Sequence, residues 1–178
     1  MKLVVATMVA LAGLAAVAAD STPLSELEPV SSSQGWGQLA TDQSGWGKPM
    51  QIGERQFATG LGTHANSELV YDLERAFERF EAWVGVDAAV AGHAGGTVVF
   101  KVLADGRELF NSGVMRLASP AQRVSVVVHD VSELKLVVTD AGDGGTADHA
   151  NWAEAVFVGK PQPAAAVPAL RPTKFRVR

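Results

Sequence analysis

Three aspartates in a glycine-rich stretch are the side chains of this sequence best suited to hold a cation. Asp140, Asp143 and Asp148 fall within nine positions, and three glycines lie between them. Calcium takes several oxygen ligands, mixing carboxylates with backbone carbonyls, and glycines let a loop turn its carbonyls toward an ion. The spacing predicts a calcium site at these aspartates. A solvated turn is the alternative, because aspartate and glycine are also common turn residues.

A histidine and an asparagine two positions apart offer hydrogen bonds that suit sugar hydroxyls. His64 can donate from one ring nitrogen and accept at the other, and the amide of Asn66 does both. On an extended chain, two such residues point the same way. We expect both to contact a sugar, although His64 could instead be buried and bonded to a carbonyl. His149 is open to the same two interpretations, and there we favour support of the structure or the metal.

Two tryptophans, each between glycines, suggest an apolar surface for a sugar ring. Trp36 and Trp46 lie ten positions apart in one long polar stretch, 31–49. Aromatic faces pack against the C–H groups of sugars, and a tryptophan between glycines is easily presented from a loop. We expect Trp36 or Trp46 to supply this face, with packing in the core as the alternative for each. Trp152, after the acidic stretch, is expected to pack beneath it.

Signatures of the common hydrolases are missing from the 178 residues. The sequence has no Gly-x-Ser-x-Gly elbow, no His-Glu-x-x-His pair and no cysteine. Glycoside hydrolysis needs two carboxyl groups, and the 19 acidic residues are enough to supply such a pair. A small glycan hydrolase or lyase that uses Asp148 and His149 is therefore the alternative to a binding module.

The elements that must position these residues are short strands. Apolar residues recur with period two at 69–73, 80–86, 124–128 and 153–158, and 97–104 and 134–139 are further strand-like runs. Asp105-Gly106 predicts a tight hairpin turn, and only 74–79 is compatible with a short helix. Many short strands separated by turn residues predict an all-β fold, an antiparallel β-sandwich, with loops at 31–49, 88–96 and 140–151.

The two ends of the chain differ from this central part. Residues 1–19 have a lysine followed by an apolar, alanine-rich run that ends in small residues, which predicts a cleaved signal peptide and a secreted or periplasmic protein. Residues 20–160 would form one domain. Residues 161–178 are rich in proline, alanine and basic side chains and are expected to be a flexible, solvated tail. Contact of its basic side chains with an anionic envelope surface is the alternative.

Charge argues against a nucleic-acid partner. All 19 acidic residues lie between Asp20 and Glu154, so the central domain is more acidic than the net charge of −4 suggests. Proteins that bind nucleic acid present clustered lysine and arginine to the phosphates. The central domain is better suited to neutral ligands and hard cations.

Several motifs in this order closely resemble the NPCBM family of carbohydrate-binding modules. The resemblance runs from about residue 23 to residue 158. The motifs are Gly35-Trp36-Gly37, Gly60-Leu61-Gly62-Thr63-His64-Ala65-Asn66-Ser67, Val84-Gly85-Val86-Asp87, Asp140-Ala141-Gly142-Asp143-Gly144 and Asp148-His149-Ala150-Asn151-Trp152.

The resemblance implies a galactose-binding-like β-sandwich of jelly-roll type, with structural calcium in many members. It also implies recognition of glycans that end in galactose or N-acetylgalactosamine, usually beside a glycoside hydrolase. Our prediction is a secreted, non-catalytic carbohydrate-binding module. An envelope structural or assembly protein that keeps the fold but binds no sugar is a further alternative.

Overall fold

The computed structural model describes residues 20–93 and 96–159, which form strands, two short 3-10 turns and no α-helix. The predicted signal peptide and tail lie outside these residues. The elements are β1 (Ser21–Pro23), η1 (Leu24–Glu26), β2 (Ser31–Gln34), β3 (Ala40–Thr41), β4 (Met50–Ile52), β5 (Arg55–Phe57), β6 (Gly60–His64), β7 (Ser67–Asp72), β8 (Phe77–Val86), η2 (Ala88–Val90), β9 (Thr97–Ala104), β10 (Arg107–Arg116), β11 (Gln122–Val127), β12 (Glu133–Thr139) and β13 (His149–Gly159).

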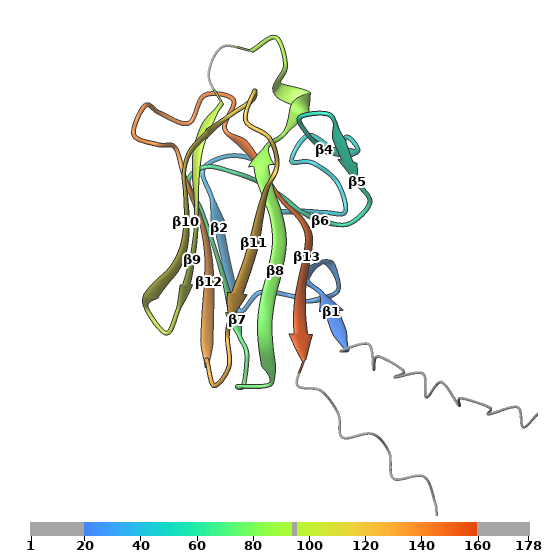
Figure 1. The fold of residues 1–178 in the computed structure, drawn as a ribbon. Helices are drawn as coiled ribbons and strands as arrows, with labels where there is room; N and C mark the ends of the chain where they lie inside the picture. The colour runs from blue at the N-terminus through green and yellow to red at the C-terminus, as the bar shows by residue number, and fades with distance from the viewer. Residues whose placement is uncertain (1–19, 94–95, 160–178) are drawn as a thin grey trace, which may run out of the picture.

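Two antiparallel sheets face each other (Figure 1). One has the strand order β11-β8-β13-β6-β3, with β1 beside β13, and the other has the order β10-β9-β12-β7-β2. The chain crosses repeatedly from one sheet to the other, and β4 and β5 form a separate hairpin. The predicted all-β sandwich is therefore confirmed.

The core lies between the sheets and follows the predicted alternation. Along β9, for example, buried side chains alternate with partly exposed ones. Trp152 is fully buried, with its ring centroid 5.0 Å from that of Phe100 and 6.1 Å from that of Phe80. Trp152 therefore packs in the main core rather than only beneath the acidic stretch. The chain has no cysteine, so no disulfide supplements this core.

The predicted turns and loops are mostly correct, with two differences. Asp105 and Gly106 have φ angles of 46° and 80°, as the predicted hairpin turn requires. The possible helix at 74–79 is absent, because Glu74 and Arg75 form a turn with positive φ and β8 then begins. The long loop 31–49 contains β2 and β3, two short polar strands whose sequences show no alternation.

The candidate site lies at one end of this sandwich. β13 begins there at His149 and ends at the opposite end beside β1, as the red and blue strands of Figure 1 show. Residues 88–93, which include η2, and residues 140–148 lie at the end where β13 begins. Within the described residues, no helix is long and apolar enough to span a membrane.

Candidate functional site

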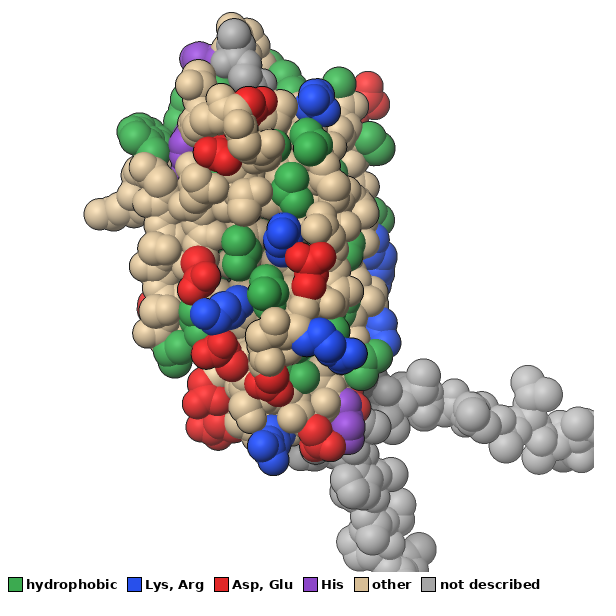
Figure 2. Space-filling view, turned by 90° about the vertical axis from the view of Figure 1, so that its left-hand side faces the viewer, with side chains coloured by type: hydrophobic (Ala, Val, Ile, Leu, Met, Phe, Trp, Pro, Cys, Tyr) green, Lys and Arg blue, Asp and Glu red, His purple; other side chains and the backbone are tan. Residues whose placement is uncertain are grey.

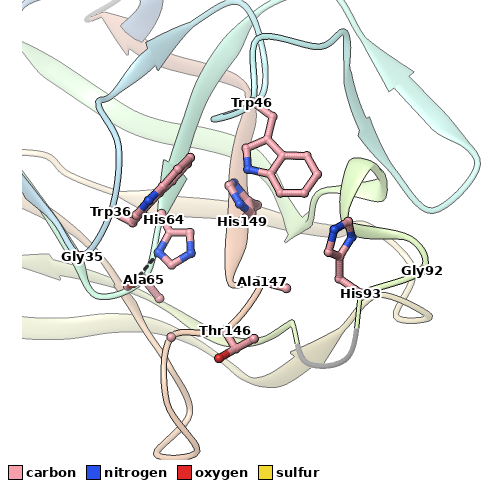
Figure 3. Close-up of a pocket in the computed structure, with 11 residues that line it drawn as sticks. Gly35, Trp36, Trp46, His64, Ala65, Gly92, His93, Thr146, Ala147 and His149 are labelled. Carbon is pink, nitrogen blue, oxygen red and sulfur yellow. Dashed lines mark hydrogen bonds between the residues drawn. The ribbon is translucent and has the colours of Figure 1, made fainter.

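A pocket of about 760 Å³ opens at this end of the sandwich (Figure 3). It draws its walls from the 31–49 stretch, the end of β6, the loop after η2, the acidic loop and the start of β13. The lining residues are Gly35, Trp36, Trp46, His64, Ala65, Gly92, His93, Gly145, Thr146, Ala147 and His149. No Asp, Glu, Lys or Arg stands among these described lining residues, so the pocket carries no permanent charge.

Two neighbouring histidines form its centre. Antiparallel pairing of β6 with β13 sets His64 opposite His149, and the ring centroids lie 4.8 Å apart. Both are largely buried, with 8 % and 4 % of their surface exposed. His64 Nδ1 donates a hydrogen bond of 2.7 Å to the carbonyl of Ala65, which leaves Nε2 of the neutral ring as an acceptor. His64 is therefore tied to a carbonyl, as the structural interpretation expects, and it also lines the pocket; its contact with a sugar stays a prediction.

Trp36 forms one side of the pocket and is held there by the pairing of β2 with β7. The backbone of Gly35 donates to the carbonyl of His64 at 3.4 Å. A Cβ at Gly35 would lie 2.4 Å from the carbonyl oxygen of Ala65, so only glycine allows this approach. The Trp36 ring lies 5.8 Å from His64 and 5.5 Å from His149, yet 56 % of the residue is exposed. Trp36 is therefore not a core residue.

Trp46 forms another side and projects from a tight turn. Ser44 is buried, and its hydroxyl accepts hydrogen bonds from the backbone of Trp46 and Lys48. The Trp46 ring lies 4.6 Å from His149, and 37 % of the residue is exposed. The structure thus brings both predicted tryptophans to the same pocket as His64, on either side of His149.

His93 completes this aromatic group and was missed by the sequence analysis. It follows η2, and its ring lies 5.1 Å from that of Trp46. The sequence signal was a histidine within a loop already predicted at 88–96. Nothing in the local sequence places that loop beside residue 46, because the two are brought together only by the sandwich.

Burial and neighbouring imidazoles keep His149 uncharged. Burial is the main cause that lowers the pKa of His149 from 6.5 to about 4, and the positive charges that His64 and His93 can carry lower it further. His149 Nδ1 is buried and has no hydrogen-bond partner. The lone pairs and N–H groups of neutral imidazoles suit hydroxyl groups rather than anions.

Asn66 does not line the pocket, contrary to the geometry expected for it. β6 ends at His64, so the chain turns at 65–66 and the two side chains do not stay on one face. Instead, Asn66 Nδ2 donates to Asp140 Oδ2 at 3.3 Å, and the backbone N–H of Asp140 donates to Asn66 Oδ1 at 3.1 Å. Asn66 therefore holds the acidic loop against the end of β6.

The three aspartates predicted as metal ligands are engaged with protein groups. Asp140 Oδ1 accepts from the backbone of Gly142, and both oxygens of Asp143 accept from the hydroxyl of Thr97. Asp148 is fully buried; its Oδ1 accepts from the backbone of Thr97, while its Oδ2 has no partner. In the part of the chain that the structure describes, no group of three or more His, Cys, Asp or Glu side chains could hold a metal ion. Side chains alone therefore do not supply a full calcium shell.

Solved structures of similar sequence share this fold. The CBM51 module of GH95 from Clostridium perfringens, solved with methyl-galactose, is 37 % identical, with a TM-score of 0.75 over 78 % of this chain and 100 % of that one. A second Clostridium perfringens structure, of the CBM51-2 module of ZmpB with GlcNAc and of INT domains, is 36 % identical, with a TM-score of 0.75 over 79 % of this chain and 32 % of that one.

Curated relatives are much longer proteins. An alpha-1,3-galactosidase B of Akkermansia muciniphila is 31 % identical over 121 residues, which make up 66 % of this chain and 15 % of that protein. The match to another curated relative spans 9 % of its length. The family model described as NPCBM/NEW2 domain matches residues 20–158, in agreement with the resemblance predicted from the motifs. The chain therefore belongs to the NPCBM/NEW2 domain family.

Proposed function

We propose that this chain is a non-catalytic carbohydrate-binding module whose pocket takes a terminal galactose-type sugar of a glycan. The observation that carries the proposal is the convergence of Trp36, Trp46, His64 and His149 on one uncharged pocket. Similar modules were solved with methyl-galactose and with GlcNAc, which supports a neutral hexose or N-acetylhexosamine as the ligand.

Each side chain has a part in this proposal. A tryptophan face packs against the C–H groups of the sugar ring, and Trp36 and Trp46 are both exposed enough to offer one. The free Nε2 of His64 accepts a hydrogen bond from a sugar hydroxyl. His149, kept neutral by burial, offers its ring without repelling a neutral ligand.

The lining of the pocket supports binding rather than catalysis. Glycoside hydrolysis uses two carboxyl groups that flank the scissile bond, roughly 5–9.5 Å apart. The described residues that line the pocket include no carboxylate. Asp148, which the hydrolase alternative requires, is fully buried and bonded to the backbone of Thr97.

A structural calcium ion is a further part of the proposal. The buried Oδ2 of Asp148 has no partner, and burial raises the pKa of this carboxyl group. Asp143 lies close by, since both aspartates bond to Thr97. A calcium ion at Asp148, completed by backbone carbonyls of the glycine-rich loop, would satisfy the unpaired oxygen.

The proposal places the module outside the cytoplasm. It rests on the predicted signal peptide at residues 1–19, with the basic tail at 161–178 available for an anionic envelope surface. Secretion would bring the module to extracellular or envelope glycans.

Titration calorimetry with galactose and N-acetylgalactosamine tests the proposal. An open single-sugar site of this kind gives weak binding, with a Kd on the order of 0.1–1 mM. Wild type should bind, whereas Trp36→Ala and His64→Ala should lose detectable binding, because losing one such contact costs about 1–3 kcal/mol. Melting curves show whether each variant is folded. A folded wild-type protein that binds neither these sugars nor any glycan on an array would contradict the proposal and favour the structural alternative.

A further inference from the structure

The pocket is larger than one sugar needs. Pockets of ~300–1,000 Å³ bury ligands the size of a drug molecule, which exceed a single hexose. This one measures about 760 Å³ and extends from Trp36 and His64 on one side to Gly92 and His93 on the other, as Figure 3 shows.

The two tryptophans are separate surfaces rather than one stacked pair. Trp36 lies 5.5 Å from His149, and Trp46 lies 4.6 Å from the same ring on its other side. Their centroids are therefore at most about 10 Å apart, a spacing that two linked pyranose rings can bridge. Trp36 contacts His64, whereas Trp46 contacts His93, so each tryptophan has a histidine of its own and shares His149.

We infer that the pocket has two sugar subsites and that its ligand is a disaccharide unit at the end of a glycan. The inference rests on the proposed function. The terminal sugar lies at Trp36 and His64, and the penultimate sugar lies on Trp46 with His93 bonding one of its hydroxyls. His149 lies between the two tryptophans, where it faces both sugar rings.

His93 and Trp46 are well placed for the second unit. The backbone N–H of His93 donates to the carbonyl of Val90 at 3.0 Å, which fixes the position of this residue after η2. Ala147 and Thr146 line the pocket below Trp46 in Figure 3, and the rings of Trp46 and His93 contact each other, with centroids 5.1 Å apart. This part of the pocket offers an aromatic face and a hydrogen-bonding ring, which are the two features that a sugar uses.

The test compares methyl-galactoside with lactose, N-acetyllactosamine and α-1,3-galactobiose by titration calorimetry. For wild type we expect at least one disaccharide to bind about tenfold more tightly than methyl-galactoside, a difference of about 1.4 kcal/mol. Trp46→Ala and His93→Ala should each weaken the tighter disaccharide about tenfold more than they weaken methyl-galactoside, which removes this gain. Trp36→Ala should abolish binding of both ligands.

His129→Ala is the matched control for His93→Ala, because His129 is also exposed but bonds to Glu78 and Asp130 outside the pocket. Its ligand affinities should equal those of wild type. Two outcomes overturn the two-subsite inference alone: all disaccharides bind no more tightly than methyl-galactoside, or Trp46→Ala weakens both kinds of ligand equally. Failure of wild type to bind any of the four ligands would instead overturn the proposed function, and the inference with it.

Discussion

Single residues give the pocket its chemical character, and the most informative is His149. Its ring is almost fully buried between two tryptophans and beside a second histidine. Burial, with a smaller effect of His64 and His93, holds the pKa of His149 at about 4. The ring is therefore neutral at pH 7, which suits a neutral ligand and makes the folded state sensitive to acid.

We expect acid to destabilise the protein through His149. An unfolded histidine has a pKa near 6.5, so between pH 6.5 and 4 the unfolded chain binds more protons than the native chain. The free energy of unfolding should therefore fall as the pH drops from 6.5 to 4. Above pH 6.5 His149 is neutral in both states, so it adds no pH dependence there.

Denaturant unfolding of wild type and His149→Asn at pH 7, 5.5 and 4.5 measures this effect. The variant should be less stable at pH 7 but lose less stability on acidification. The comparison cancels neighbouring groups such as Asp148, whose raised pKa acts in the opposite direction. Parallel pH profiles for the two proteins would show that His149 is not the responsible group.

Asn66 should prove to be a structural residue. Asn66→Ala removes two hydrogen bonds to Asp140 and should lower the free energy of unfolding by about 1 kcal/mol. Galactose affinity should stay within about threefold of wild type, as measured by calorimetry beside a melting curve. Loss of binding with an unchanged Tm would instead make Asn66 a ligand contact.

At the scale of elements, the sequence predicts where a strand lies along the chain better than it predicts which strands pair. Alternation identifies β7, β8, β9 and β12 because each has one face in the core. β2 and β3 are short, polar edge strands and carry no such pattern. The same limit explains the site, since the β6–β13 register that pairs His64 with His149 and the meeting of His93 with Trp46 are long-range contacts.

The loop that carries Trp46 depends on a glycine in the strand beneath it. A Cβ at Gly62 in β6 would lie 2.4 Å from the carbonyl oxygen of Gln43 and 2.6 Å from the nitrogen of Gly45. Both are backbone atoms, so the loop itself must move if any side chain is added.

Gly62→Ala should therefore displace this loop and reduce both stability and binding. We expect a loss of about 1–3 kcal/mol in unfolding free energy, typical of overpacking, together with weaker disaccharide binding. Gly159→Ala is the control, because the atom nearest its added Cβ, the carbonyl oxygen of Asp20, lies at an ordinary 3.4 Å and far from the pocket. Wild-type melting and affinity in Gly62→Ala would refute this dependence.

For the whole molecule, the sandwich holds at one end a pocket whose described lining residues carry no permanent charge. Figure 2 shows acidic and basic side chains mixed over one face, with acidic side chains also at its upper end, beside the histidine and apolar side chains at the upper left edge. The fold therefore presents an uncharged site on an acidic protein whose stability depends on its core.

Calcium should stabilise this whole domain if the proposed ion is present. An ion that binds only the native state adds about 2.7 kcal/mol at a hundredfold excess over its Kd. For a domain of this size the Tm should rise by roughly 5 °C in millimolar calcium relative to excess chelator. Asp148→Asn, which keeps the shape of the side chain, should abolish the shift. Identical melting curves of wild type with calcium and with chelator would contradict the calcium proposal.

The location of the sugar is the central claim, and the indole N–H signals of the four tryptophans test it most directly. In an NMR titration with methyl-galactoside, the account predicts the largest shift for the Trp36 signal. The Trp46 signal should shift less, because Trp46 lies on the other side of His149. The signals of Trp83 and the buried Trp152 should not move. Single Trp→Phe variants assign the four signals. Saturable movement of the Trp83 signal with Trp36 and Trp46 unchanged, or no movement of any signal up to 20-fold above the expected Kd of about 1 mM, would contradict the account.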